Sequence, residues 1–406
     1  MSQEKNNPCG LILLTTDFKP MNGGVAEYLH HLWDHLARFH PVTVMTPVQP
    51  GSSLWEHSYR LQTLPPLASR RLGKKWGDQT MVLRKLNTAR YFLSLRRHAK
   101  QIVKIVRENG GDNVHVFIGI WDIESHFWCQ ALRRAAISYS LHAYGRELVL
   151  PLYGRLPQWR KRDFANAREI VAISKGTAGL AQNFLSTSPP MRIVTPGAGP
   201  LPDRETWAKK SGELKKELGL SGRNILLTVG RLVPRKGVDL VLRSVAELAG
   251  KYQNLRYLVG GDGPESERLR SLTKSLGIQP RVSFLGQVDE TTKWALYDLC
   301  DLFVMPNRLM NGTDWEGFGI VFLEAALLGK VSIGGNNGGV PDAIQDGVTG
   351  LLVDPEKNGD LTGAMDRLLS DQNLLQRMGL AARKRAEDEF NWPAIVARFR
   401  AEQGWL

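Results

Sequence analysis

The sequence lacks the features of several protein classes. It has only three cysteines, Cys9, Cys129 and Cys300, too widely spaced for a disulfide framework or a zinc site, so we expect a reducing, cytosolic compartment. No apolar run reaches the roughly 18 residues of a membrane-spanning helix, and the apolar stretch at 11–14 is too short for a signal peptide. We find no metal-ligand cluster, no repeats and no low-complexity segment.

Acidic residues are scarce in the first half of the chain. Residues 1–200 carry 26 Lys and Arg against 13 Asp and Glu, whereas residues 201–406 carry 27 of each, and the net charge is +13. Residues 68–107 hold 12 basic side chains and one acidic side chain, Asp78. This asymmetry indicates an acidic partner for the first half: a phospholipid surface, an anionic glycolipid or nucleic acid.

The length of 406 residues predicts two domains, and the 42% of apolar residues suffices for a large core in each. In both halves, short apolar runs alternate with amphipathic stretches, which predicts the α/β class with doubly wound parallel sheets. The predicted strands are 11–15, 42–46, 114–118, 137–141, 169–173, 224–229, 255–260, 281–285, 301–305, 330–334 and 351–353. Ligands of such sheets bind outside the carboxyl ends of the strands, so we expect a cleft there. Prolines and glycines predict a linker near 196–202.

The strongest functional motif follows the strand predicted at 301–305. Glu316 precedes a helix predicted from about Gly319 to Gly329, and Glu324 lies within this helix. The free N–H groups of residues 319–321 would form an anion site suited to a diphosphate. The alternative is a plain helix with one carboxylate favourable to its dipole and one solvated glutamate. The flanking glycines argue against this alternative, because they are costly at a helix start.

A second motif follows the strand predicted at 224–229. It reads GRLVPRKG at 230–237, and its cations Arg231 and Lys236 could neutralise a pyrophosphate leaving group. Taken alone, a solvated basic loop is an equally good interpretation.

The pair Gly23 and Gly24 precedes a predicted helix, where glycines allow close approach to a phosphate or simply make a tight turn.

Three further features are weaker. His142 directly follows the strand predicted at 137–141, which would place it in the cleft, although a lone histidine is more often structural. Ser174 follows the strand predicted at 169–173 and is expected to cap the next helix. The glycine-rich segments 338–342 and 346–350 are predicted as turns.

Taken together, these segments resemble the retaining family-4 glycosyltransferases of the GT-B fold, over nearly the whole chain. The resemblance rests on GG at 23–24, VAIS at 171–174, GRLVPRKG at 230–237, GGDGPE at 260–265, EGFGIVFLEA at 316–325 and GGVPDAIQDGVTGLLVDP at 338–355. It implies a Rossmann-like acceptor domain at 1–198, a Rossmann-like nucleotide-sugar donor domain at 199–388, and a final helix at 389–406 that crosses back. One departure is Gly329-Lys330-Val331-Ser332, where the family usually has Gly-x-Pro-Val.

The resemblance also implies residue roles. Arg231 and Lys236 would hold the donor diphosphate, Glu316 the hydroxyls of the transferred sugar, and Glu324 the ribose. His142 would lie beside the sugar, near its 6-position. The phosphates would also contact the amides of Gly24, Phe318, Gly319, Ile320 and Val321, and Gly23 lies next to Gly24. The base would be bordered by Gly261 and by the segment Arg281–Val288, including Val288.

The resemblance implies transfer of a hexose with retention from a UDP- or GDP-linked donor, with no cofactor or metal required. Because no second carboxylate stands where a nucleophile is expected, we favour a same-face mechanism in which the leaving diphosphate takes the acceptor proton. The acceptor is expected to be an anionic glycolipid, a lipid-linked saccharide or a cell-envelope polysaccharide. A transferase for soluble small acceptors, an inactive GT-B binding protein and a pyridoxal-dependent phosphorylase remain alternatives.

The basic part of the first half predicts where the acceptor or a membrane would bind. Residues 80–107 form a predicted helix with an apolar stripe and many cations, which is typical of elements that dock on anionic lipid. The residues expected to contact the acceptor or an anionic membrane surface are Arg96, Arg97, Lys100, Arg146 and Ser174. The alternative is an ordinary surface helix with a solvated basic face. We expect no nucleic-acid partner, because no recognition or stacking motif is present. The expected location is cytoplasmic, including peripheral attachment to the inner face of the cell membrane.

Overall fold

The computed structural model describes residues 10–19, 21, 23–47, 57–64, 81–110, 114–149, 156–185, 187–199, 201–310, 312 and 314–405. Part of the basic stretch considered above, residues 68–80, lies outside them, as do the side chains of 81–89. The chain divides into two compact units. The first contains Met1–Ile173, Ala178–Val194 and Val396–Leu406, and the second contains Ser174–Thr177 and Thr195–Ile395.

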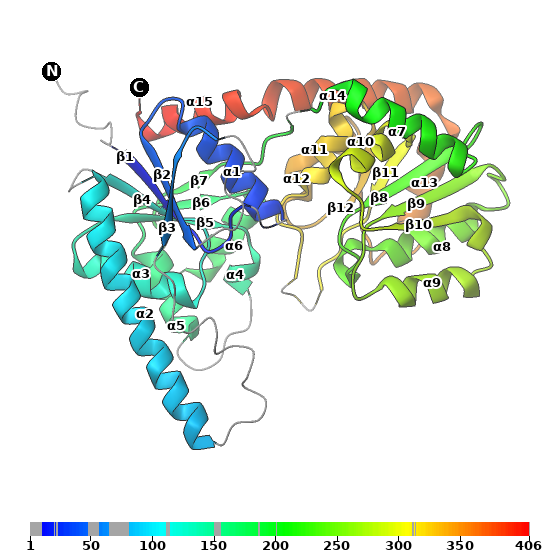
Figure 1. Cartoon of the computed structure of the whole chain (residues 1–406). Helices are drawn as coiled ribbons and strands as arrows, with labels where there is room; N and C mark the ends of the chain where they lie inside the picture. The colour runs from blue at the N-terminus through cyan, green and yellow to red at the C-terminus, as the bar shows by residue number, and fades with distance from the viewer. Residues whose placement is uncertain are drawn as a thin grey trace. The chain divides into compact units, whose positions relative to one another are not determined.

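The first unit is built on a parallel sheet of seven described strands, in the order β3-β2-β1-β4-β5-β6-β7 (Figure 1). The strands are β1 Gly10–Leu14, β2 Val42–Pro47, β3 Arg60–Leu64, β4 Val114–Ile118, β5 Tyr139–Ala143, β6 Ile170–Ala172 and β7 Met191–Ile193. Every residue of β1, β4 and β5 is buried, as expected for central strands covered on both faces. The sequence analysis missed β3 and β7, and it placed β5 too early, at 137–141.

Helices cover both faces of this sheet. They are α1 Gly24–Leu36, α2 Met81–Gly110, α3 Ile123–Arg134, α4 Arg146–Val149, α5 Leu156–Ala165 and α6 Lys175–Phe184. On one face, Ile102 and Val106 of α2 and Leu132 of α3 join a buried core with the strands. On the other face, Trp33 of α1 packs edge-on against Phe117 of β4 at a centroid distance of 5.0 Å.

The second unit contains a parallel sheet of six described strands, in the order β10-β9-β8-β11-β12-β13. The strands are β8 Asn224–Val229, β9 Leu255–Gly260, β10 Val282–Gly286, β11 Leu302–Met305, β12 Val331–Gly335 and β13 Gly350–Val353. All pairings in both sheets are parallel. The order reverses between β8 and β11, so the loops that follow these two strands lie at the topological switch point, where such sheets bind ligands. The predicted α/β class with two parallel sheets is thereby confirmed.

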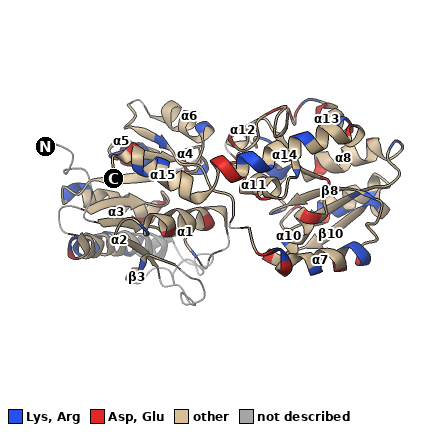
Figure 2. Ribbon diagram, turned by 90° about the horizontal axis from the view of Figure 1, so that it is seen from above, with Lys and Arg blue, Asp and Glu red and all other residues tan. Residues whose placement is uncertain are grey.

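The helices of the second unit are α7 Arg204–Glu217, α8 Val238–Leu248, α9 Ser266–Ser275, α10 Glu290–Leu299, α11 Ile320–Leu327, α12 Val340–Ala343, α13 Asp360–Ser370 and α14 Gln372–Glu389. The short 3-10 helices are η2 Pro234–Lys236 and η3 Gln279–Arg281. Figure 2 shows both Lys/Arg and Asp/Glu on α7 and α14, in keeping with the balanced charge of this half. On α14 the opposite charges pair four residues apart, as Lys384 does with Asp388 at 2.7 Å.

The last helix, α15 Trp392–Gln403, begins in the second unit and ends in the first. In the first unit, Phe399 and Trp405 pack against Phe117 with ring centroids 6.3 and 6.4 Å apart. Gln403 donates a hydrogen bond to buried Glu169 at 2.5 Å. No helix of the described residues is both long and apolar enough to cross a membrane.

Candidate active site

The candidate site of the second unit is centred on the carboxylate of Glu316. Three donors converge on its Oε2 atom: Lys236 Nζ at 2.6 Å, Asn307 Nδ2 at 2.8 Å and the Arg235 guanidinium. The side chain of Glu316 is 13% exposed and that of Lys236 is 12% exposed, so the charges are largely withdrawn from water. Its Oε1 atom accepts no hydrogen bond from another described residue, which leaves this oxygen available to a ligand.

The cations determine the charge of Glu316. Burial alone would raise its pKa, but Lys236 and Arg235 outweigh burial, and the pKa of Glu316 lies below its usual value of 4.5. The carboxylate is therefore ionised at neutral pH. It neutralises one of the two cations that the sequence places at the end of β8.

The three cations of the GRLVPRKG segment have different surroundings. Lys236 contacts Glu316, whereas the exposed side chain of Arg231 makes no hydrogen bond or ion pair with another described residue. Arg235 contacts Glu316 and lies 3.2 Å from Asp314. The sequence analysis quoted Arg235 as part of the motif without giving it a role.

Asparagines at the ends of β11 and β12 complete the environment of Glu316. Asn307 is fully buried, and Asn337 donates a hydrogen bond to its carbonyl oxygen at 2.5 Å. The Oδ1 atoms of both asparagines are buried and accept no hydrogen bond in the described part of the chain. The sequence analysis missed both residues. Their position directly after buried strands was the available signal.

The start of α11 provides backbone donors next to Glu316. The amides of Phe318, Gly319, Ile320 and Val321 donate to no other described residue, as is usual for the first turn of a helix. Gly319 has φ +91°, a left-handed conformation that favours glycine. The helix ends at Leu327, and Gly329, with φ +69°, follows its C-cap residue Leu328, which confirms the predicted C′ glycine.

The segment predicted as a turn at 338–342 packs directly on this loop. The amide of Gly339 donates to the carbonyl oxygen of Glu316 at 2.9 Å. A Cβ atom at Gly339 would lie 1.9 Å from the carbonyl oxygen of Gly317, so only glycine fits. The second glycine of this segment therefore holds the backbone of Glu316 in place.

Glu324 lies on the same helix and has a separate set of partners. Its Oε1 accepts from Lys293 Nζ at 2.6 Å, and its Oε2 accepts from the Tyr297 hydroxyl at 2.8 Å. Burial lowers the pKa of Lys293, but Glu324 and Glu290 outweigh burial, so the net pKa is raised and the ammonium stays charged. Both partners lie on α10 and were missed by the sequence analysis. The two glutamates therefore belong to two distinct polar clusters.

The residues assigned to the base lie at opposite ends of β10. Val288 follows this strand at its carboxyl end, and Gly261 follows β9 beside it, with its amide donating to Gly286 at 2.7 Å. Arg281, in contrast, precedes β10 and donates to the carbonyl oxygens of Ala249 and Gln253. The strand β10 thus lies between Arg281 and Val288, and the assignment of this segment to the base stays a prediction.

In the first unit, His142 lies inside β5 and not after it, because the strand extends to Ala143. It is 1% exposed, and burial lowers its pKa to about 3, so the imidazole is neutral at physiological pH. Its Nε2 atom is buried without a hydrogen-bond partner among the described residues. The rings around it belong to Tyr28, Trp33, Phe117 and Tyr144.

The other predicted residues of the first unit have simple surroundings. Gly23 and Gly24 form the start of α1, with Gly23 as the N-cap. Arg146 is exposed at the start of α4. Ser174, which belongs to the second unit, accepts a hydrogen bond from the Thr177 amide at 3.0 Å, which confirms the predicted helix cap. Arg96, Arg97 and Lys100 line a groove between α2 and α3.

Comparisons with known proteins point to one class of enzyme. Residues 210–385 match a family model described as "Glycosyl transferases group 1". A GDP-mannose-dependent alpha-(1-6)-phosphatidylinositol monomannoside mannosyltransferase of Mycolicibacterium smegmatis is 27% identical over 402 residues, covering 96% of both chains. The N-acetyl-alpha-D-glucosaminyl L-malate synthase of Bacillus anthracis is 33% identical over 201 residues, 48% of this chain and 50% of that one.

Solved structures show the same architecture. Anabaena Alr3699/HepE, in complex with UDP and glucose, has a TM-score of 0.74 at 17% identity, covering 98% of this chain and 100% of that chain. WaaG, a glycosyltransferase involved in lipopolysaccharide biosynthesis, has a TM-score of 0.65 at 18% identity, covering 96% of this chain and 99% of that chain. At these identities the similarity concerns the fold.

Proposed function

Because the chain is a glycosyltransferase of the GT-B fold, we propose that it transfers a hexose with retention from a nucleoside diphosphate sugar to a hydroxyl of an anionic glycolipid. The observation that carries the donor proposal is the Glu316 cluster. Two cations and one carboxylate lie there beside a helix start whose amides are unused. A diphosphate can bind to the cations and the amides, and the hydroxyl groups of a sugar can donate hydrogen bonds to the carboxylate.

The donor diphosphate would bind to the cations and the helix start. Phosphate oxygens are good acceptors for Lys and Arg and for the free amides of a helix N-terminus. When the diphosphate takes over Lys236 and Arg235, Glu316 is released from at least one of its partners. Its carboxylate then accepts hydrogen bonds from hydroxyls of the transferred sugar. We also assign Arg231 to the diphosphate, because it is an uncommitted cation of the same segment.

Glu324 would bind the ribose of the donor. Lys293 and Tyr297 hold both of its oxygens, so the side chain has a fixed orientation. An ionised carboxylate has about four lone-pair sites, so it can accept from ribose hydroxyls without losing these partners. Gly261 and Val288, at the carboxyl ends of β9 and β10, would border the base.

The transfer reaction would proceed on one face of the sugar. The bond between the anomeric carbon and the acceptor oxygen forms while the bond to the leaving phosphate oxygen breaks, and the acceptor proton passes to that phosphate oxygen. Lys236, Arg235 and the amides of residues 318–321 stabilise the negative charge that develops on the diphosphate. No metal takes part in this scheme. In the first unit, we assign His142 to the sugar and the amide of Gly24 to the phosphates.

The proposed acceptor follows from the relatives and from the charge of the first half. Two relatives whose alignments cover 95% or more of this chain are named as mannosyltransferases that act on phosphatidylinositol monomannosides. The 26 Lys and Arg against 13 Asp and Glu of residues 1–200 would attract an anionic lipid surface. We therefore propose that the first unit attaches to an anionic membrane and that the acceptor is a glycolipid in it.

A donor screen followed by a transfer assay tests this function. Thermal unfolding with GDP-mannose, UDP-glucose and their ADP- and CMP-linked counterparts identifies the donor, since a ligand at 100 times its Kd stabilises by about 2.7 kcal/mol. Transfer is then measured to phosphatidylinositol mannosides, and to L-malate as a soluble acceptor, with the anomeric configuration of the product read by NMR. No stabilisation by any donor contradicts the donor site, transfer to malate alone contradicts the glycolipid acceptor, and an inverted product contradicts retention.

A further inference from the structure

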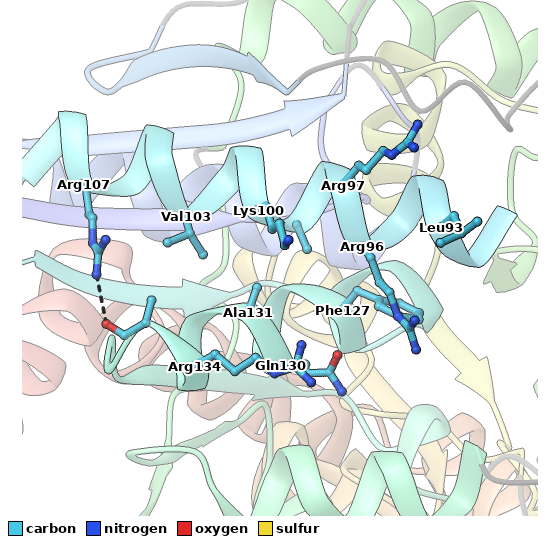
Figure 3. Close-up of a pocket in the computed structure, with 12 residues that line it drawn as sticks. Leu93, Arg96, Arg97, Lys100, Val103, Arg107, Phe127, Gln130, Ala131 and Arg134 are labelled. Carbon is cyan, nitrogen blue, oxygen red and sulfur yellow. Dashed lines mark hydrogen bonds between the residues drawn. The ribbon is translucent and has the colours of Figure 1, made fainter. Parts of the chain in front are cut away.

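A groove lies between α2 and α3 of the first unit, outside the candidate site (Figure 3). Its volume is about 700 Å³, within the size range of pockets for small molecules. Five cations line it, and none of the lining residues is Asp or Glu. These cations are Arg96, Arg97, Lys100 and Arg107 from α2 and Arg134 from α3.

No acidic residue in the described part of the chain pairs with the cations that line the groove. Arg96, Arg97, Lys100 and Arg134 form no ion pair with another described residue. In Figure 3, Arg96 points from α2 toward Phe127 and Gln130 of α3. Arg107 donates to the carbonyl oxygen of Ala135 at 3.3 Å and so joins the ends of the two helices. The groove therefore presents a row of cations that have no ionic partner among the described residues.

The floor of the groove is apolar and continues into an aromatic pocket. Ala99, Val103 and Ala131 line the basic part. The adjoining pocket, of about 540 Å³, shares Leu93, Arg96, Phe127 and Gln130 with the groove and adds the aromatic residues Phe92, His126 and Trp159. One continuous surface thus has cations at one end and aromatic rings at the other.

The aromatic end is rigid and leaves apolar surface exposed to solvent. Trp159 stacks on His126 with centroids 4.6 Å apart and planes 7° from parallel, and His126 in turn contacts buried Asp163 at 2.6 Å. Leu93 is 52% exposed between the two pockets. Leu93 therefore belongs to the exposed apolar surface that the two pockets share.

We propose that this groove binds a single anionic phospholipid. The phosphate would lie among Arg96, Lys100 and Arg134, and an acyl chain would run over Leu93 and Phe127 toward the aromatic pocket. The proposal rests on the membrane attachment proposed above and assigns it a defined site. An acyl chain would cover the apolar floor formed by Ala99, Val103 and Ala131, which the phosphate backbone of a nucleic acid would leave exposed to water.

A matched pair of double variants tests the site. Arg96→Ser with Lys100→Ser removes two cations of the groove, whereas Arg90→Ser with Lys104→Ser removes two exposed cations of the same helix that do not line it. Binding of dihexanoyl phosphatidylglycerol below its micelle concentration is measured by titration calorimetry. We expect the wild type to bind one lipid per chain and not to bind dihexanoyl phosphatidylcholine. Each groove cation that is removed should weaken binding about fivefold, whereas the control pair should change the Kd less than twofold.

A third variant and two competitors complete the test. Leu93→Ser changes no charge and should also weaken binding of the lipid, because the acyl chain loses its contact. An equal loss from both double variants, full competition by inorganic phosphate, or tighter binding of a short DNA duplex would each overturn the lipid site. Binding to phosphatidylglycerol vesicles separates the groove from the membrane attachment. If the wild type binds these vesicles and both double variants bind them equally weakly, the membrane attachment stands and only the groove is contradicted.

Discussion

Replacing Glu316 by glutamine should separate turnover from nucleotide binding. The substitution keeps the shape of the side chain and removes its charge, so Lys236 and Arg235 lose the anion that neutralises them. In the wild type, a nucleoside diphosphate must compete with Glu316 for these cations. We therefore expect Glu316→Gln to bind GDP or UDP as tightly as the wild type or more tightly. Its kcat should fall roughly 100-fold, as is usual when one contact to the transition state is lost.

The same substitution has a cost in stability that the nucleotide should reverse. Breaking a fully buried ion pair costs about 3–5 kcal/mol, but the partners keep 12% and 18% exposure, and Asp314 stays 3.2 Å from Arg235. We expect a loss of about 2 kcal/mol, or roughly 4–8 °C in Tm for a unit of this size. The diphosphate should restore more stability to the variant than to the wild type.

The acid side of the stability profile provides an independent check. Because the folded pKa of Glu316 lies below 4.5, its cluster stabilises the fold above pH 4.5 and loses this contribution as the pH falls through the lowered pKa. The glutamine variant should lack this part of the acid dependence. The assays are kcat with the identified donor, calorimetric Kd for the free diphosphate, and thermal unfolding between pH 3 and 7. A loss of diphosphate affinity as large as the loss of kcat would refute the reasoning.

Three further predictions test other parts of the site. Glu324→Gln should weaken nucleoside diphosphate binding about tenfold and leave kcat at saturating donor within a few-fold. Calorimetry and steady-state kinetics check this, and a loss of kcat as large as that of Glu316→Gln would contradict separate roles for the two glutamates. Gly339→Ala should destabilise the second unit by more than 2 kcal/mol in urea unfolding, because its Cβ would lie 1.9 Å from a carbonyl oxygen; Gly363→Ala, with open space at its Cβ, is the matched control. His142→Phe should remain folded among the surrounding rings but lose transfer at least tenfold, and unchanged kcat/KM would exclude a catalytic role. With a pKa of about 3, His142 should add no inflection to the wild-type rate between pH 5 and 8.

The parts of the fold that were predictable from sequence are those with mostly apolar runs. β4, β8 and β9 were predicted at their observed bounds, because each is a mostly apolar and mostly buried strand of a parallel sheet. β3 and β7 were missed for the opposite reason. They are the edges of their sheet, and only one residue of β3 and none of β7 is buried, so periodicity gave no signal. The error in β5 moved His142 from the interior of a strand to its end.

The site was predictable where a motif combines with a strand end. Glu316 and Lys236 were both found in this way, although they are 80 positions apart and meet only in the fold. Lys293 and Tyr297 could not be found, because they lie in a segment without a distinctive pattern, and Asn307 was missed although it closely follows the buried strand β11. Their importance arises from tertiary contacts with Glu316 and Glu324. Sequence motifs therefore indicated the carboxylates and Lys236 but not the other donors that orient the carboxylates.

The choice between Arg231 and Arg235 shows how charge balance bears on the mechanism. A motif with two arginines and a lysine offers three cations to a diphosphate, but two of them already contact Glu316. Of the three, only Arg231 has an exposed side chain without a hydrogen bond or ion pair to another described residue, so we expect it to make the first contact with an incoming donor. Lys236 and Arg235 become available only when the diphosphate displaces the carboxylate. On this argument Arg231 governs the rate of donor association, which salt should slow, while Arg235 governs the orientation of Glu316 and hence turnover.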